Sequence, residues 1–197
     1  MLSATAQFIN DNYRSKRGFI AAFKCKLLFS LGFHRLYQNI DFNAVNRLVF
    51  ICSDNICRSA FGEYMAKAEG LNAVSYGLHC RGGDKVDPRA IHEASIRNFD
   101  MQNYMTRNIF EYKGQEGDWL LVMEPLHLVE LNIKEVKYEQ VTLVPLWSDN
   151  KTAYLNDLFN ATAIFFSFCE SAVEQCVKNI HTKLISKKKY IDLCFFL

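Results

Sequence analysis

Short apolar segments alternate with helix-forming segments along most of this chain, and this alternation sets narrow limits on the fold. The apolar segments are rich in aliphatic and aromatic residues, as buried strands are, and a segment of helix formers follows each of them. The expected strands span 47–52, 73–78, 119–123 and 140–145, and the expected helices span 59–69, 87–98, 125–132 and 160–184. This order predicts the α/β class, here a four-stranded parallel sheet with helices on both faces.

The charges divide the chain into three parts. Residues 1–45 carry a net charge of +4, residues 183–197 carry +3, and the middle part, 46–182, carries −5. We therefore expect a basic N-terminal extension (1–45), one globular domain (46–182) and a basic, aromatic C-terminal tail (183–197). The negative charge of the central domain argues against nucleic acid as its partner.

The N-terminal extension contains a segment with helical periodicity. Its apolar residues recur near helical spacing between positions 19 and 31, and Arg17, Lys24 and Arg35 add positive charge. The segment 17–37 is therefore predicted to form an extra, basic amphipathic helix. Such a helix packs against the domain, or it makes a peripheral contact with an anionic membrane surface or a partner helix.

Neither a membrane span nor a secretory signal is expected. Lys24 and Lys26 interrupt the best apolar stretch before it reaches the ~18 residues that a spanning helix needs, and this stretch begins late for a signal peptide. The seven cysteines are odd in number, scattered and without C-x-x-C pairs, which predicts reduced thiols. The expected location is the cytoplasm.

The join between the first strand and the first helix carries the most specific pattern. Cys52 is followed by a five-residue loop and then by Arg58 and Ser59; the loop residues are Ser53, Asp54, Asn55, Ile56 and Cys57. A loop from a strand end to a helix start directs its backbone N–H groups inward, so that they surround a tetrahedral anion at the positive end of the helix dipole. A cysteine there is favoured as thiolate and can attack phosphorus, while the Arg58 guanidinium holds two phosphoryl oxygens without a metal or cofactor.

This segment resembles the signature of the low-molecular-weight protein tyrosine phosphatases. Residues 47–63, RLVFICSDNICRSAFGE, are similar to the family's strand and C-x-G-N-I-C-R-S-P loop with an acidic residue after it. Residues 75–90 resemble its S-A-G stretch ending in D-P-x-A, and residues 118–131 resemble its D-L-I-L-V-M-D element and the helix that follows. The resemblance covers about 46–182. It implies a metal-independent, cysteine-dependent hydrolase that removes phosphate from phosphotyrosine through a cysteinyl-phosphate intermediate.

The resemblance also implies roles for individual residues. It assigns the nucleophile to Cys52, the phosphate-binding arginine to Arg58, the serine that stabilises the thiolate to Ser59, and the residue that orders the loop to Asn55. Cys57 matches a position that can form a reversible disulfide with the nucleophile. Redox protection of the nucleophile and packing in the core are therefore two equal interpretations of Cys57. The length of 75–90 matches the bacterial branch, whose members often act on autophosphorylated tyrosine kinases. Such a kinase is the expected phosphotyrosine protein substrate.

Three departures from the family pattern lie near the predicted site. Asp54 replaces the glycine of G-N-I-C and brings a negative charge beside an anion site, so it either weakens phosphate binding or points to solvent. Ala60 replaces the proline after R-S, and Glu124 replaces the aspartate of the V-M-D element.

The general acid does not follow directly from the family pattern, because the D-P-[YF] tripeptide is absent. The nearest match is Asp157-Leu158-Phe159, between the fourth strand and the last helix. We predict that Asp157 protonates the leaving tyrosine oxygen and that Phe159 forms one wall of the slot for the phenyl ring. A helix N-cap is the other interpretation of Asp157, and Asp149 is the reserve candidate for the acid.

The loop after the second strand is expected to border the substrate pocket. Arg81 lies in this loop, and the resemblance implies that Arg81 and His79 could recognise acidic substrate peptides. Apart from this, His79, His92 and His127 lack metal-ligand spacing and are expected on the surface or in packing.

Two other functions are compatible with the same loop. A thioredoxin-coupled arsenate reductase needs two relay cysteines, but Cys169 and Cys176 fall in the last predicted helix. Seven residues apart on a helix, they are about 10 Å from each other, too far for a disulfide without unwinding. The second alternative is a catalytically weak or inactive phosphotyrosine-binding module, suggested by Asp54 and the missing D-P-[YF] tripeptide.

Overall fold

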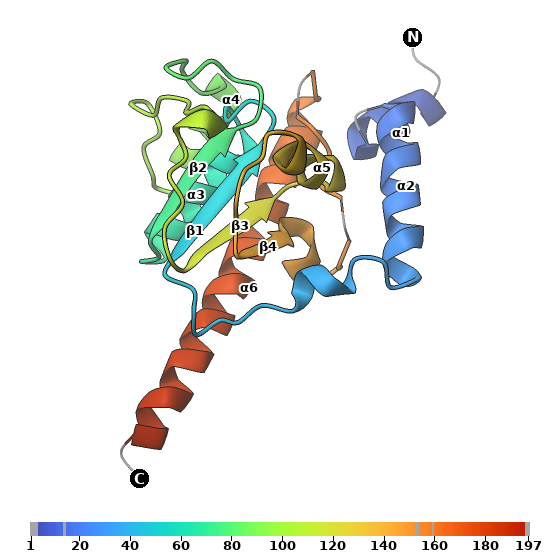
Figure 1. Ribbon diagram of the computed structural model, residues 1–197. Coiled ribbons are helices and arrows are strands. Elements are labelled where there is room, and N and C mark those ends of the chain that lie inside the picture. Colours follow the sequence, from blue (N-terminus) through green and yellow to red (C-terminus); the bar gives the residue numbers. More distant parts are fainter. Residues whose placement is uncertain (1–3, 14, 153, 159, 196–197) are drawn as a thin grey trace.

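A four-stranded parallel sheet forms the centre of the structure, which confirms the predicted fold class (Figure 1). The computed structural model describes residues 4–13, 15–152, 154–158 and 160–195. The strands are β1 (Arg47–Cys52), β2 (Ala73–Gly77), β3 (Asp118–Val122) and β4 (Gln140–Leu143), in the spatial order β2-β1-β3-β4. β1 therefore lies inside the sheet, and its carboxyl end is at the side where ligands bind in parallel sheets.

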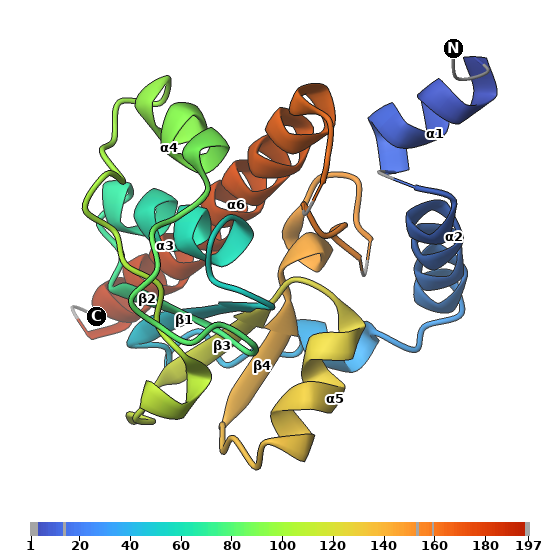
Figure 2. The same cartoon turned by 90° about the horizontal axis from the view of Figure 1, so that it is seen from above.

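Helices cover both faces of the sheet (Figure 2). α3 (Arg58–Ala68), α4 (Pro88–Ser95) and α6 (Ala163–Phe195) pack on one face, and α5 (Pro125–Ile133) packs on the other. Successive residues of β1 serve the two faces in turn: Leu48 and Phe50 join the cluster with α3 and α6, and Val49 and Ile51 join the cluster with α5. Because β1 is buried on both sides from Leu48 to Cys52, this part of its sequence is an unbroken apolar run.

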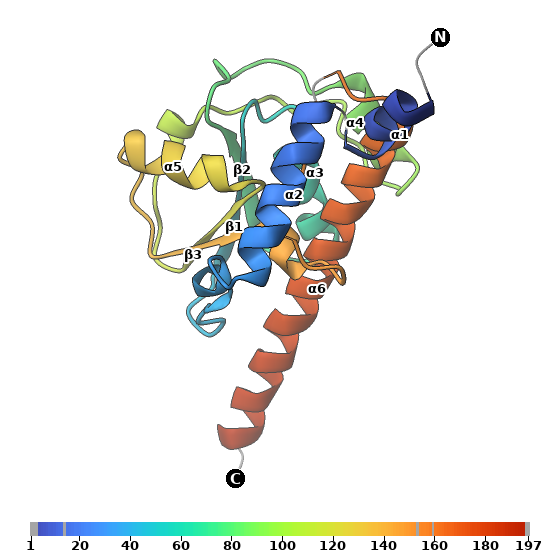
Figure 3. The same ribbon diagram turned by 90° about the vertical axis from the view of Figure 1, so that its right-hand side faces the viewer.

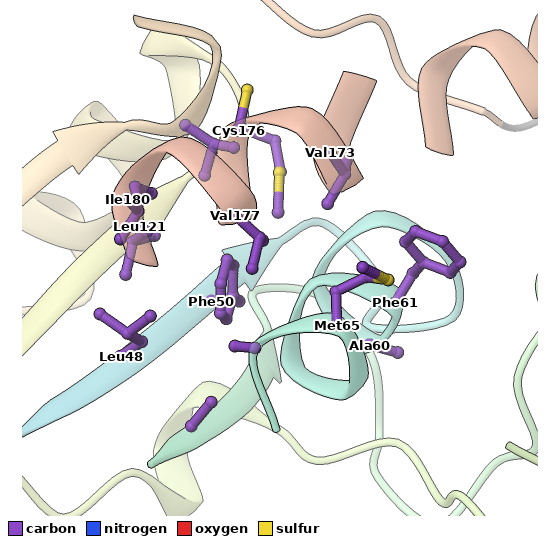
Figure 4. Packing of buried hydrophobic residues seen from close by; sticks show 14 of the residues in the cluster. Leu48, Phe50, Ala60, Phe61, Met65, Leu121, Val173, Cys176, Val177 and Ile180 are labelled. Carbon is purple, nitrogen blue, oxygen red and sulfur yellow. The ribbon is translucent and has the colours of Figure 1, made fainter. Parts of the chain in front are cut away.

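Close packing between the sheet and the helix pair α3 and α6 positions the start of α3. Val177 and Ile180 of α6 point toward Phe50 and Leu121 of the sheet (Figure 4). α3 approaches the same Phe50 ring through Gly62, where an added Cβ would lie only 2.8 Å from the ring. A larger residue there would push α3 away from β1 and disturb the loop between them.

Two element boundaries near the site have local causes. The strand predicted to end at residue 145 ends at Leu143, because Pro145 has no N–H for the sheet and lies in the 3₁₀ turn η3 (Val144–Trp147). A second 3₁₀ turn, η2 (Ile109–Glu111), precedes β3. α4 starts at Pro88 because Asp87 caps it by accepting a hydrogen bond from the Arg89 amide (2.8 Å).

The N-terminal extension forms two helices and a 3₁₀ turn, so the prediction of one helix over 17–37 is wrong in its extent. These elements are α1 (Ala4–Tyr13), α2 (Lys16–Ser30) and η1 (Arg35–Gln38). Ser15 caps the start of α2 by accepting a hydrogen bond from the Gly18 amide (3.1 Å). Gly32, with a φ of +88°, ends α2 in a Schellman motif, in which its own amide and the next one bond to carbonyls of the last turn.

α6 continues beyond the predicted end at residue 184. The Thr162 hydroxyl accepts a hydrogen bond from the Phe165 amide (3.3 Å) at its start, and the helix runs to Phe195 because no glycine or proline follows residue 184. The predicted boundary at residue 183 therefore lies within a helix whose last turns project away from the domain (Figure 1, Figure 3). Among the described residues, no helix has the length and apolar character that crossing a membrane requires.

Candidate active site

The segment between β1 and α3 forms a tight loop at the carboxyl end of the sheet. The surrounding chain binds its carbonyl groups: the Ser53 carbonyl accepts from the His79 amide (2.7 Å), and the Ile56 carbonyl accepts from the Asp87 amide (3.0 Å). Gly77 at the end of β2 permits this approach, since a Cβ there would lie 2.8 Å from the Asp54 backbone. Backbone contacts thus hold the loop from outside.

Asn55 holds the loop from inside. It is fully buried and has a φ of +57°, a left-handed conformation that asparagine tolerates better than most residues. Its side-chain amide donates to the hydroxyls of Ser59 (2.9 Å) and Ser75 (2.8 Å). Its side-chain oxygen accepts from the Tyr104 hydroxyl (2.8 Å) and the Arg107 amide (2.9 Å). Every polar group of this side chain is therefore satisfied, as expected of a residue that orders a loop.

A second layer of polar residues supports Asn55, and the sequence reasoning missed most of it. Glu63 of α3 is 1% exposed, accepts from the Ser75 hydroxyl (2.8 Å), and pairs with the Arg107 guanidinium through the same oxygen. Tyr104 joins this layer through its hydroxyl, 2.6 Å from that of Ser75. Tyr104 and Arg107 lie 49 and 52 positions from Asn55 in the sequence, so no local pattern identifies them.

The Cys52 sulfur lies among polar groups at the floor of the loop. It accepts a hydrogen bond from the Asn55 amide (3.3 Å) and is 2.9 Å from the Ser59 hydroxyl oxygen. The Asn55 side chain already donates to that Ser59 oxygen, so the Ser59 hydrogen is available for the sulfur. Two donors are thus directed at one sulfur, as at a position that carries negative charge during attack on phosphorus.

Arg58 begins α3 beside the sulfur, with its guanidinium buried. Nη1 donates to the Leu155 carbonyl (2.8 Å) and lies 3.5 Å from a Glu124 carboxylate oxygen. Nη2 donates to Asp157 Oδ1 (3.4 Å). Burial disfavours the charged form, but the pKa of Arg58 is raised because Cys52, Glu124 and Asp157 surround it. The positive charge is therefore retained in the buried site, where the planar fork suits a phosphoryl group.

A narrow pocket of about 20 Å³ opens over the sulfur. Its described walls come from the loop, the start of α4 and the segment before α6, and consist of Cys52, Asp54, Ile56, Cys57, Arg58, Asp87 and Asp157. The pocket thus brings the predicted nucleophile, arginine and general acid together, although Asp157 lies 99 positions from Arg58 in the sequence. The Asp157 side chain is 32% exposed, so it can reach a ligand that enters from solvent.

Two other predicted residues, Asp149 and Arg81, are not among these walls. Asp149 is exposed, and its carboxylate accepts from the side chains of Gln175 (2.7 Å) and Asn179 (3.0 Å) on α6. Arg81 is exposed in the loop after β2. Phe159 lies outside the described residues.

His127 lies beside the loop, although it was expected to have no part in the site. It is 1% exposed, and its Nε2 is 3.3 Å from the Ser53 hydroxyl and 3.2 Å from a Glu124 oxygen. Burial raises the pKa of Glu124, but the His127 hydrogen bond and the Arg58 charge outweigh burial and hold this pKa below its usual range. Glu124 is thus ionised between Arg58 and His127. The position of His127 in the first turn after β3, at the same end of the sheet as Cys52, is the signal that could have identified it.

Asp54 is half-buried in the pocket wall, a position from which its charge would oppose the binding of an anion. We expect Asp54→Asn to bind inorganic phosphate about five- to tenfold more tightly, because one negative charge near a dianion is removed. Inhibition by phosphate at low and high salt measures this, and the gain should shrink as salt screens the charge. Asp84→Asn, in an exposed loop, is the control, and equal inhibition constants for the two variants would contradict the expectation.

A buried carboxyl lies behind the loop, on α6. Glu170 is 0% exposed, and neither of its oxygens has a hydrogen-bond partner among the described residues. Burial raises the pKa of Glu170 to about 8; Arg58 on α3 and Arg97, just after α4, oppose this shift, while Glu93 and Asp87 add to it. Glu170 is therefore mostly neutral near pH 7, and the sequence contained no signal for it.

The stability of the protein is expected to fall with rising pH because of Glu170. The pKa of Glu170 in the folded state lies above its unfolded value of about 4.3. The contribution of neutral Glu170 to the free energy of unfolding is therefore fully present below the unfolded pKa and is lost as the pH rises toward 8. Relative to Glu170→Gln, the wild type should lose up to about 4 kcal/mol of unfolding free energy between pH 5 and pH 8. Urea unfolding at the two pH values measures this difference.

Glu174→Gln, one turn further along α6, is the matched control for Glu170. Burial raises the pKa of Glu174, but its hydrogen bond with Arg97 (2.6 Å) outweighs burial and lowers it. Removing this carboxylate should therefore cost stability at pH 8. If the free energy of unfolding depended on pH in the same way for the wild type and Glu170→Gln, Glu170 would not be held neutral in the folded protein, and the expectation would be wrong.

The other cysteines near the site are packed into the core. Cys57 lines the pocket and also joins a small apolar cluster with Cys169 and Phe165 of α6. Cys169 and Cys176 are buried in α6, and neither belongs to the described walls of the pocket. This placement does not suit the disulfide relay of an arsenate reductase.

Comparison with known proteins confirms the resemblance of the central domain. The family model for low molecular weight phosphotyrosine protein phosphatases matches residues 47–190. The low molecular weight protein-tyrosine-phosphatase Wzb of Salmonella typhi is 29% identical over 109 residues, which are 54% of this chain and 73% of the relative. For further curated relatives, the matched part covers about 60% of their length.

Solved structures share the fold at low sequence identity. The tyrosine phosphatase Wzb from Escherichia coli K30, in complex with sulphate, has a TM-score of 0.61 and 24% identity over 71% of this chain and 99% of that chain. The YwlE arginine phosphatase from Geobacillus stearothermophilus has a TM-score of 0.63 and 14% identity over 74% of this chain and 96% of that chain. Since the family model spans well over half of the sequence and these structures share its sheet and helices, the chain belongs to the low molecular weight phosphotyrosine protein phosphatase family, whose members are cysteine-based hydrolases.

Proposed function

We propose that this protein hydrolyses phosphotyrosine in proteins, with Cys52 as the nucleophile. The position of the Cys52 sulfur carries this proposal: it receives the Asn55 amide, contacts the Ser59 hydroxyl and shares one pocket with Arg58 and Asp157. Attack on phosphorus needs an activated nucleophile, a cation for the phosphoryl oxygens and an acid for the leaving oxygen. These groups meet all three needs.

The reaction has two steps. In the first, the Cys52 thiolate bonds to phosphorus while the bond from phosphorus to the tyrosine oxygen breaks, and Asp157 gives that oxygen its proton. In the second, water attacks phosphorus, Asp157 takes a proton from the water, and the bond to sulfur breaks. Inorganic phosphate leaves, and the thiolate and the protonated Asp157 are restored. Arg58 holds the phosphoryl oxygens in both steps, and Ser59 stabilises the sulfur as it departs.

Phosphate release from a panel of phosphopeptides tests this proposal. We expect phosphotyrosine peptides to be hydrolysed much faster than phosphoserine and phosphothreonine peptides. The reason is that Cys52 is 3% exposed, and only a long side chain brings phosphorus to its sulfur. A phosphoarginine peptide belongs in the panel because an arginine phosphatase shares the fold. Preference for phosphoarginine would overturn the substrate, and binding of phosphotyrosine without release over hours would indicate a binding module.

We further infer that the protein acts in the cytoplasm on an autophosphorylated tyrosine kinase, and that its N-terminal extension makes a peripheral contact with a membrane or a partner. The described free cysteines, Cys25, Cys52, Cys57, Cys80, Cys169 and Cys176, support a reducing compartment. The resemblance to the bacterial branch supports a kinase substrate. A Cys52→Ser variant used as a trap in cell extract should capture such a kinase, and a set of trapped phosphoproteins without one would contradict this inference.

A further inference from the structure

The surface of α2 carries a group of large apolar side chains that are exposed to solvent. Figure 3 shows α2 along the outside of the molecule. Seven apolar residues on α2 and just after it are between 40% and 82% exposed: Phe19, Ile20, Phe23, Leu27, Leu31, Phe33 and Leu36. We call these seven residues the apolar face. Single exposed apolar residues are common, whereas a contiguous group of this size marks an interaction site.

The opposite side of α2 holds the helix on the domain. Gly18 is buried, and Cys25 and Phe29 pack against the cluster between the sheet and α5. These positions are seven and four residues apart, so they share one side of the helix. The residues of the apolar face on α2 therefore point outward from a helix whose orientation is set by its packing.

Positive charges border the apolar face on both sides. Successive residues of an α-helix are rotated by about 100° around its axis. Viewed down the axis of α2, Lys24 and Lys26 therefore lie roughly 80° to either side of the centre of the helical part of the apolar face, and Arg17 lies next to Lys24. All three residues are exposed. Between Asp11 and Asp41 the sequence has six lysines and arginines and no acidic residue. Basic side chains in these positions can reach lipid phosphates while apolar side chains enter the acyl region.

From this arrangement we propose that α2 docks the protein on an anionic membrane surface, with the helix lying in the plane of the bilayer. Such a surface offers an apolar layer for the apolar face and, directly above it, negative charge for the lysines and arginines. A second copy of the chain is a poor occupant, because two acid-free cationic faces would repel each other.

Docking through α2 would also keep the pocket near the bilayer. An added Cβ on Gly18, near the start of α2, would lie 2.9 Å from the Asn156 side-chain oxygen, and Asn156 precedes Asp157. The first turn of α2 therefore borders the segment that forms one wall of the pocket. Phosphotyrosines close to a membrane would be the preferred substrates, a consequence that rests on the proposed phosphatase function.

Sedimentation with phospholipid vesicles tests the docking without any use of enzyme activity. We expect the full chain to bind vesicles that contain phosphatidylglycerol at least about tenfold more tightly than vesicles of phosphatidylcholine alone, with binding that weakens as salt is raised. The double variant Phe23→Glu with Leu27→Glu should lose nearly all binding. Lys24→Gln with Lys26→Gln should weaken binding and reduce its dependence on salt.

Ile96→Glu is the matched control, because Ile96 is an exposed apolar residue at the end of α4, on the other face of the sheet from α2. It should bind vesicles as the wild type does, and circular dichroism checks that every variant is folded. Absence of binding to anionic vesicles would overturn the docking. The docking would also be overturned if Phe23→Glu with Leu27→Glu bound vesicles as the wild type does, or if the wild type formed a dimer in solution and this variant did not.

The catalytic consequence has its own measurement. A phosphotyrosine peptide anchored to anionic vesicles should be hydrolysed several-fold faster than the same peptide in solution, and Phe23→Glu with Leu27→Glu should remove the difference. If vesicles bind the protein but neither peptide is hydrolysed, the proposed phosphatase function fails and the docking stands.

Discussion

Replacing Cys52 with serine is expected to reduce phosphate release by roughly 10⁴-fold or more. A serine hydroxyl is almost never ionised at neutral pH, so the attacking anion is lost even though the side chain keeps nearly the same shape. The contacts that hold the site do not depend on the sulfur: Asn55 remains bonded to Ser59 and Ser75, and Arg58 remains on the Leu155 carbonyl. The variant should therefore still bind a phosphotyrosine peptide.

Two measurements separate chemistry from binding in this variant. Phosphate release should disappear, while fluorescence polarisation with a labelled phosphotyrosine peptide should show an affinity within a few-fold of the wild type. In acid-quenched wild type, mass spectrometry should find one phosphoryl group on the peptide that contains Cys52. Cys25→Ser is the control, since Cys25 lies on α2 outside the pocket walls. A phosphoryl group on another residue, or substantial turnover by Cys52→Ser, would refute the assignment.

Replacing Asp157 with asparagine is expected to slow the hydrolysis of phosphotyrosine by about 10²- to 10⁴-fold. The tyrosine oxygen is a poor leaving group unless it is protonated, and Asp157 is a partly exposed acid in the wall of the pocket, next to Arg58. Its Oδ1 rests 3.4 Å from Arg58 Nη2. A phosphoryl group that takes this guanidinium nitrogen would displace the carboxylate toward the leaving oxygen. Asparagine keeps the shape of the side chain but has no proton to give.

A comparison of leaving groups distinguishes an acid from a residue that only positions Arg58. Asp157→Asn should be slow on phosphotyrosine but close to the wild type on dinitrophenyl phosphate, whose leaving group departs without a proton. Asp149→Asn is the control and should match the wild type on both substrates, because its carboxylate is bound to Gln175 and Asn179. An equal loss on both substrates would assign Asp157 to positioning, and a selective loss in Asp149→Asn would move the acid there.

The elements of the sheet could be predicted because their signals are local. The predicted bounds of β1 match the observed ones, since burial on both faces favours an apolar residue at each position from Leu48 to Cys52. The loop residues are consecutive, so one segment of sequence contained Cys52, Asn55, Arg58 and Ser59 together. The predicted N-terminal helix agrees with α2 in position but is too long, because the helical periodicity of the sequence continues past Gly32, whose left-handed backbone ends the helix.

The residues around the loop could be predicted only in part, because each depends on how distant elements pack. Asp157 was proposed from its order in the chain, but its contact with Arg58 depends on the fold of the segment before α6. His127 was placed among surface or packing residues, since a single histidine in a helix has no pattern of its own. No local pattern distinguishes Glu170, because the sequence of α6 is equally helical whether that position faces solvent or the core.

The sequence by itself therefore determined the order of strands and helices, the class of the sheet and the chemistry of the loop. These properties follow from apolar periodicity and from residues that are neighbours along the chain. Only the tertiary structure decided which acids lie beside Arg58, that a carboxyl is buried behind the loop, and that the apolar face of α2 is turned outward. Contacts between distant segments set these features, and the free energy of such contacts depends on packing geometry that no local pattern contains.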